Sequence, residues 1–205
     1  MNFHMKKGKL KIAVTGGIGS GKSAFSNFIS GCSYPVINVD NVSKEILISD
    51  EDIKLKVKKE FGEESYQNGD INKKFLAGKI FSNPRNVIKI NSIVHPKVIE
   101  KVNILIDEKL KEYDIVFAEA ALIYEAAMDK YFDYVVLITA EDKLRLKRKV
   151  RLNNFTEEQF LKRNENQIPD SEKKKQADFV FENNGSLDEL KLKADLLLKI
   201  LKGLK

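Results

Sequence analysis

Residues 10–23 are Leu10-Lys11-Ile12-Ala13-Val14-Thr15-Gly16-Gly17-Ile18-Gly19-Ser20-Gly21-Lys22-Ser23. An apolar, β-branched run is followed directly by the pattern G-x-x-x-x-G-K-S, which is typical of a strand, a glycine-rich loop and a helix in succession. Glycine allows positive φ, so successive loop N–H groups turn towards one anion, and the helix adds its positive dipole end. The stretch therefore predicts a phosphate-binding loop for a nucleoside triphosphate.

Two neighbouring residues of this loop are expected to have different ligands, one the phosphates and the other a metal ion. Lys22 is expected to reach the β- and γ-phosphates, and the hydroxyl of Ser23 to complete the shell of a Mg²⁺ ion. The residues expected to contact the nucleotide are Gly17, Ile18, Gly19, Ser20, Gly21, Lys22, Ser23 and Ala24. A glycine-rich turn without a ligand is the alternative, but eight positions in register argue against it. The motif does not identify the acceptor of the phosphate.

Composition places the chain among globular proteins of the reducing cytosol. Of its 205 residues, 42% are hydrophobic, which suffices for a sizeable core, and no apolar run approaches the ~20 residues of a membrane span. The N-terminus has no apolar signal region, and the single cysteine, Cys32, excludes an intramolecular disulfide and is expected to be packed. We therefore expect a cytoplasmic protein without a membrane partner, and a monomer or weak homo-oligomer.

The net charge of +6 favours polyanionic ligands, nucleotides and nucleic acids alike. Lysine residues are dispersed among glutamates along the expected helices rather than gathered in one stripe. This pattern is typical of a solvated surface, so we expect no nucleic-acid partner.

Short apolar stretches alternate with longer helical ones, which is the pattern of a parallel β-sheet covered by helices. The stretches are nearly continuous in apolar character, so we expect strands buried on both faces. The five predicted strands are Leu10–Thr15, Pro35–Val39, Asp114–Ala118, Asp133–Ile138 and Asp178–Phe181. They predict a nucleotide-binding core made of residues 9–42, 113–140 and 176–205.

Two excursions interrupt this core. Residues 43–112 contain no convincing strand and are too long for a simple crossover, so we interpret them as an inserted helical subdomain that binds the acceptor. The helices predicted around and within it are Val42–Ile48, Glu51–Phe61, Asn72–Phe81, Pro84–Ile93 and Pro96–Glu112. Residues 141–175 form the second excursion, with a basic helix, a break at Asn153-Asn154 and a helix capped by Thr156.

Three acidic residues follow predicted strands, at the sheet edge where open α/β sheets bind ligands. Asp40 ends the strand that we expect to neighbour the phosphate loop, where it is either a general base or the N-cap of a helix beginning at Asn41. Glu119 closes a later strand, where it either holds Mg²⁺ or is merely a strand end. Glu125, on the following loop, either contacts the acceptor or caps a helix.

Arginine is rare in this chain, yet Arg145, Arg148 and Arg151 recur on one face of the basic helix, and Arg163 and Gln167 follow on the next. Guanidinium groups suit the spread charge of a transferring phosphoryl group, so we favour this role over a solvated basic face. His95-Pro96 lies in the insertion, where a cap or a packed side chain is the commoner role for a lone histidine.

Taken together, these motifs resemble those of the dephospho-coenzyme A kinase family, a group of kinases with a phosphate-binding P-loop. The resemblance runs from about Lys9 to the C-terminal helix and is carried by an ordered set of segments rather than by the loop alone. These are Val14–Ser23, Val36–Asp40, Phe61-Gly62, Asn68-Gly69, Phe81, Ile90–Pro96, Glu119–Glu125, the arginines with Gln167, and Ala177–Ser186.

The resemblance implies a P-loop NTPase fold, a three-layer α/β/α sandwich, and transfer of the γ-phosphate of ATP to the ribose 3′-hydroxyl of dephospho-coenzyme A. It implies that Asp40 is the base, that Lys22 and Arg148 act in catalysis, and that Arg145 and Asn183 bind ATP, with Asn183 near the adenine. It further implies that the helical insertion with His95 helps to hold the acceptor and that residues 141–175 form a lid. Together with the interpretation of the individual residues above, this makes Asp40, His95 and Glu125 the expected acceptor-binding residues, and Ser23 and Glu119 the expected ligands of Mg²⁺.

The chain departs from the family pattern at a few positions. Asn38 replaces the first acid of the usual pair, which leaves Asp40 as the one carboxylate there, while Ala24 and Ala121 replace a common threonine and proline. Another P-loop kinase of small molecules or nucleotides is the nearest alternative function. A nucleotide-dependent switch protein is less favoured, because Asn72-Lys73-Lys74-Phe75 lacks the acid of a guanine-reading motif.

Overall fold

The computed structural model describes residues 8–153 and 156–204, with the backbone alone for residues 152 and 153. The chain divides into two compact units. The first comprises Met1–Asn38 and Leu105–Lys205, and the second comprises Val39–Ile104. The second unit is thus an insertion in the sequence of the first.

The first unit contains a five-stranded parallel sheet, and the α/β fold expected from the sequence is confirmed. Each predicted strand is present, with its ends moved by one residue at most. The strands are β1 (Leu10–Thr15), β2 (Val36–Asn38), β5 (Ile115–Glu119), β6 (Tyr134–Thr139) and β7 (Phe179–Glu182), in the order β2-β5-β1-β6-β7.

This strand order corrects one prediction. We expected the strand before Asp40 to neighbour the phosphate loop, but among the described strands β2 pairs with β5 alone, and β5 separates it from β1. In the register, Val14 on β1 faces Glu119 on β5, and Glu119 in turn faces Asn38 on β2. Strand pairing depends on contacts between distant segments, so the local sequence could not specify it.

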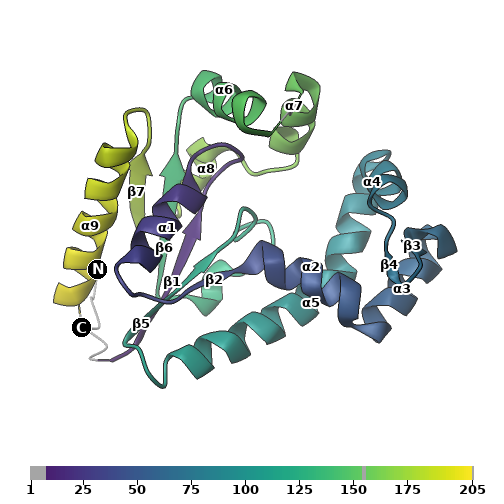
Figure 1. The fold of residues 1–205 in the computed structure, drawn as a ribbon, viewed down its shortest axis with the longest axis horizontal. Helices are drawn as coiled ribbons and strands as arrows, with labels where there is room; N and C mark the ends of the chain where they lie inside the picture. The colour runs from purple at the N-terminus through teal and green to yellow at the C-terminus, as the bar shows by residue number, and fades with distance from the viewer. Residues whose placement is uncertain (1–7, 154–155, 205) are drawn as a thin grey trace. The chain divides into compact units, whose positions relative to one another are not determined.

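One face of the sheet is covered by helices α1 (Lys22–Gly31) and α9 (Leu187–Gly203), which pack side by side (Figure 1). Phe25 and Ile29 of α1 meet inward residues of the strands, and every second residue of β1, β5 and β6 points into this layer. The core residues of α9 are Leu190, Ala194, Leu197, Leu198 and Leu201. Burial of this apolar surface stabilises the sheet, and the parallel pairing of its strands brings their carboxyl ends to one edge.

Burial on both faces holds for β1, β5 and β6 but not for the edge strands. All three residues of β2 are half-buried, and β7 alternates between half-buried and exposed residues, since each edge strand has only one neighbour. Cys32, at the end of α1, is exposed, so the prediction that it packs was wrong.

The second unit is mainly helical. Its elements are α2 (Val39–Ser49), α3 (Glu51–Phe61), the 3₁₀ turn η1 (Glu63–Ser65), β3 (Tyr66–Gln67), β4 (Asp70–Ile71), α4 (Lys73–Phe81) and the part of α5 (Pro84–Lys109) that ends at Ile104. Strands β3 and β4 form a hairpin around Asn68 and Gly69, which both have positive φ. The sequence predicts no strand here, because strands of two residues are too short to show in an apolar pattern.

Helix α5 is continuous through Pro96, which corrects the predicted break at His95-Pro96. Proline inside a helix removes a hydrogen bond and costs about 3 kcal/mol. The helix persists because the residues at four-residue intervals around the proline, Ile90, Val94, Val98 and Val102, are all buried on one side. Packing of this stripe offsets the local penalty.

The segment after β6 contains three helices, α6 (Asp142–Asn153), α7 (Glu157–Glu165) and the unpredicted α8 (Asp170–Lys174). Thr156 caps α7 as expected: its hydroxyl accepts from the N–H of Gln159, and the Gln159 side chain accepts from the N–H of Thr156. Of the expected break, Asn153 ends α6 and Asn154 lies outside the described residues. None of the described helices combines the length and apolar character needed to cross a membrane.

Candidate nucleotide-binding site

The loop between β1 and α1 has the backbone geometry of an anion cradle. Gly19 and Gly21 have φ of 79° and 98°, in the left-handed region that glycine adopts without strain, and Gly21 caps α1. Gly17 is required for space as well, because a Cβ at this position would overlap the guanidinium of Arg145. The glycines therefore serve the loop's shape and its contact with α6.

Two oxygen-bearing side chains meet at the start of α1. The hydroxyl of Ser23 donates a 2.6 Å hydrogen bond to Oε1 of Glu119, at the carboxyl end of β5, and Nζ of Lys22 lies 4.0 Å from the same oxygen. Hydroxyl and carboxylate oxygens are the ligands that Mg²⁺ prefers, so these residues fit a magnesium ion. Parallel pairing of β1 with β5 brings the two residues together across 96 positions of sequence.

A cavity of about 440 Å³ opens above the loop. Besides loop residues, it is lined by Arg148, Lys149, Asn183, Gly185 and Leu187. With Lys22 these side chains supply three cationic groups and no carboxylate, which suits a triphosphate. Burial, reinforced by the charges of Lys22 and Arg163, lowers the pKa of Lys149. Sequence reasoning missed Lys149, because it is one lysine among many in a basic helix.

The three arginines of α6 have different environments, so their shared helical face does not mean a shared role. Arg148 donates from Nη2 to the carbonyl of Asn183 at 2.9 Å, while its Nη1 is buried without a hydrogen-bond partner among the described residues. Arg151 is exposed. Only Arg148 of the three thus presents an unsatisfied buried donor in the wall of the cavity.

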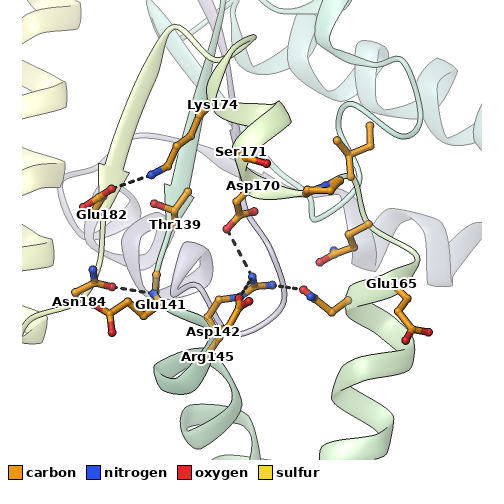
Figure 2. Close-up of a pocket in the computed structure, with 15 residues that line it drawn as sticks. Thr139, Glu141, Asp142, Arg145, Glu165, Asp170, Ser171, Lys174, Glu182 and Asn184 are labelled. Atoms are coloured by element: carbon orange, nitrogen blue, oxygen red, sulfur yellow. Dashed lines mark hydrogen bonds and ion pairs between the residues drawn. The ribbon is translucent and has the colours of Figure 1, made fainter.

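Arg145 is 4% exposed, and its guanidinium is already engaged within the protein. It donates from Nε to the carbonyl of Ile18 at 2.9 Å, from Nη1 to Asp142 at 2.8 Å and from Nη2 to Asn164 at 2.7 Å. Nη1 also lies 3.6 Å from Asp170 (Figure 2). These contacts join α6, α7 and α8 to the phosphate loop.

A larger cavity of about 710 Å³ lies beside Arg145, between the ends of β6 and β7 and helices α6 to α8 (Figure 2). Its wall carries two cationic residues, Arg145 and Lys174, and five carboxylates: Glu141, Asp142, Glu165, Asp170 and Glu182. Burial raises the pKa of Asp170, although the charge of Arg145 opposes that shift. Because the carboxylates would repel phosphate, we assign the nucleotide to the smaller cavity despite its lesser volume.

Asn183 follows β7 and is buried. Its Nδ2 donates to the carbonyl of Ser20 at 2.8 Å, its N–H donates to Thr139, and its carbonyl accepts from Arg148. A Cβ at Gly21 would overlap the Asn183 amide. Asn183 thus braces the phosphate loop, in addition to lining the cavity.

The three residues expected to hold the acceptor do not fall in one unit. Glu125 belongs to the first unit, where its Oε1 lies 2.8 Å from Nζ of Lys173 and accepts from the N–H of Ile168. Asp40 and His95 belong to the second unit. Asp40 is exposed in the first turn of α2, which begins at Val39, so it is not the N-cap of a helix starting at Asn41. His95 is half-buried in mid-helix, and burial lowers its pKa.

Comparison with known proteins agrees with this geometry. The family model described as dephospho-CoA kinase matches residues 10–189. The chain belongs to the dephospho-CoA kinase family. The dephospho-CoA kinase of Bacteroides fragilis is 35% identical over 176 residues, which cover 86% of this chain and 85% of the relative. That of Bacillus cereus is 32% identical over 190 residues, 92% of this chain and 95% of the relative. The solved structure of the dephospho-CoA kinase from Campylobacter jejuni superposes with a TM-score of 0.71 at 25% identity and covers 95% of this chain and 98% of its own.

Proposed function

We propose that this chain, as an ATP-dependent dephospho-CoA kinase, transfers the γ-phosphate of ATP to the ribose 3′-hydroxyl of dephospho-coenzyme A with Asp40 as the general base. The observation that supports ATP as the phosphate donor is the cationic cavity over the phosphate loop, with Ser23 hydrogen-bonded to Glu119 beside it. Membership of the family supports the identity of the acceptor.

In this proposal the phosphate loop binds the β- and γ-phosphates through backbone N–H groups, and Lys22 neutralises their charge. Arg148 donates its free Nη1 to the phosphoryl group as negative charge spreads over the equatorial oxygens. Ser23 and Glu119 would hold Mg²⁺, which screens the phosphate charge when bound.

Asp40 accepts the proton of the attacking hydroxyl. Two observations support this assignment. Its carboxylate is exposed, and among the described residues it makes no ion pair or side-chain hydrogen bond that would occupy it. Along the chain it follows Asn38 by two residues, and Asn38 is the register partner of Glu119. A positioned carboxylate of this kind contributes about 10²–10⁴-fold to a proton transfer.

Further parts of the proposal concern the acceptor, the lid and the setting of the reaction. We assign the helical unit, with His95, to binding of the acceptor, and residues 141–175 to a lid that excludes water from the phosphoryl transfer. The adenine of ATP is assigned to the part of the cavity next to Asn183. A cytoplasmic protein acting as a monomer or weak homo-oligomer, without a nucleic-acid partner, fits these roles.

The decisive experiment measures ADP release with a panel of acceptors that includes dephospho-coenzyme A, a nucleoside, a nucleoside monophosphate and DNA. We expect rapid release only with dephospho-coenzyme A and a product phosphorylated at the 3′ position, identified by ³¹P NMR. Faster release with a nucleoside or its monophosphate would instead favour another P-loop kinase. Release stimulated only by DNA would reject the proposal.

A further inference from the structure

A buried ion pair between Glu125 and Lys173, which has no part in the proposed phosphoryl transfer, joins two segments of the first unit. Glu125 lies on the loop after β5, and Lys173 lies on α8, so the pair connects the sheet to the end of the lid segment. The side chain of Lys173 is 0% exposed and that of Glu125 is 11% exposed. Burying two charges carries a large desolvation penalty, so a buried ion pair does not necessarily stabilise the fold. Its effect can instead be to position the segments that it joins.

The pair is connected to the phosphate loop through two hydrogen bonds. Oε1 of Glu125 accepts from the backbone N–H of Ile168 at 2.9 Å. The preceding residue, Gln167, uses its side-chain Oε1 to accept from the backbone N–H of Ile18 at 3.0 Å. Glu125 therefore fixes the backbone at Ile168, and the neighbouring residue Gln167 binds the phosphate loop at Ile18.

Ile18 is bound on both of its backbone groups by the lid segment. Its N–H donates to Gln167, and its carbonyl accepts from Nε of Arg145. Ile18 lies between Gly17 and Gly19, whose missing side chains leave the backbone there with unusual conformational freedom. The shape of the loop at this point consequently depends on where the lid segment places Gln167.

From this relay of two hydrogen bonds, Ile168 to Glu125 and Ile18 to Gln167, we infer that Glu125 is a positioning residue for ATP binding. It places Gln167 against Ile18 and so sets the phosphate loop in its binding conformation, while Lys173 only balances its buried charge. The inference rests on the proposed function only in taking the loop as the nucleotide site. It gives Glu125 an indirect role in nucleotide binding rather than a contact with the acceptor. The near-complete burial of its side chain and the two partners of Oε1 support that choice.

The test separates the hydrogen bond from the charges. In the double variant Glu125→Gln/Lys173→Met both charges are removed, but a side-chain oxygen still accepts from Ile168, so we expect ADP affinity close to that of the wild type. In Glu125→Leu/Lys173→Met the acceptor is lost as well, and we expect ADP affinity, measured by calorimetry, to fall about tenfold. Glu172→Gln, which breaks an exposed ion pair between α8 and the following residue, Lys175, is the matched control and should change nothing.

Dependence on Gln167 distinguishes positioning from a general loss of structure. Gln167→Ala alone should weaken ADP binding about as much as Glu125→Leu/Lys173→Met, and combining the three substitutions should weaken it no further. The ATP KM should rise in parallel, while the dephospho-coenzyme A KM stays constant. Additive losses, or a rise in the acceptor KM alone, would overturn the inference.

A conservative variant and a binding measurement that needs no turnover complete the test. Glu125→Asp keeps the charge balance of the buried pair but draws the oxygen back from Ile168, so it should fold and still weaken ADP binding; unchanged affinity in a folded Glu125→Asp variant counts against the relay. Calorimetry with ADP does not require turnover. If the wild type binds ADP but fails to phosphorylate dephospho-coenzyme A, the proposed function fails while the relay is still tested.

Discussion

Oγ of Ser23 and Oε1 of Glu119 lie 2.6 Å apart, so the first turn of α1 is joined by a hydrogen bond to the carboxyl end of β5. The two residues are neighbours because β1 and β5 pair in parallel with Val14 opposite Glu119. Glu119 is 6% exposed, and the ammonium group of Lys22 lies 4.0 Å from its carboxylate. Hydroxyl and carboxylate oxygens are the ligands that Mg²⁺ prefers, which is why the proposed function assigns the metal ion to this pair.

Glu119→Gln should raise the Mg²⁺ concentration needed for half-maximal activity by about tenfold, because the neutral amide loses the charge that attracts the cation. The measurement is initial rate against free Mg²⁺ at saturating ATP and acceptor. Glu108→Gln, at an exposed position of α5, serves as the control. An unchanged Mg²⁺ dependence would remove Glu119 from the metal site.

Lys22→Ala should reduce turnover to near background, because in the proposed function Lys22 is the loop residue that neutralises the β- and γ-phosphates. Circular dichroism should remain that of the wild type, since the side chain is not part of the apolar core. Lys199→Ala, on an exposed position of α9, should retain full activity. Substantial residual turnover in folded Lys22→Ala would exclude this role.

Asp40→Asn should lower kcat by about 10²–10⁴-fold and leave ATP affinity unchanged, because the amide cannot take the hydroxyl proton. The matched control is Asp52→Asn, which alters another exposed aspartate in the first turn of a helix of the same unit. Near-normal kcat in Asp40→Asn would show that the base is another group.

Arg148→Lys should lower kcat while leaving the melting temperature close to that of the wild type, because charge is kept but the second donor of the guanidinium fork is lost. Arg151→Lys, on the exposed part of the same helix, should have no effect on either quantity. If Arg148→Lys keeps its full rate, the unsatisfied Nη1 has no part in phosphoryl transfer.

Gly17→Ala should raise the ATP KM and lower the melting temperature, because the added Cβ overlaps the Arg145 guanidinium, which is held by three hydrogen bonds. Gly78→Ala supplies the contrasting control. A Cβ there meets no atom within 4 Å and lies in α4, so this change should stabilise the protein by about 1 kcal/mol. Equal behaviour of the two variants would mean that the contact between the loop and α6 is unimportant.

Much of the fold could be predicted because its signals are local. The glycine pattern after Leu10–Thr15, the five apolar stretches and the capping residue Thr156 each act through neighbours in sequence, and all are found in the structure. The prediction was wrong where distant packing overrides a local preference, as at Pro96, which stays inside α5. It was also wrong about the neighbour of β1, because strand order is a matter of long-range pairing.

The site residues also fall into those that the local sequence predicts and those that only the tertiary structure reveals. Residue types and their order along the chain were enough to nominate the phosphate loop, Ser23, Glu119 and the basic helix, because each role requires a particular chemical group next to a strand or helix end. Only the tertiary structure distinguished the arginines of that helix, since burial and partners decide whether a guanidinium is engaged, as in Arg145, or has a free donor, as in Arg148. It likewise revealed Lys149 in the cavity wall and the link from Glu125 through Ile168 and Gln167 to Ile18. Those contacts join segments more than 40 residues apart, and no local pattern in the sequence encodes them.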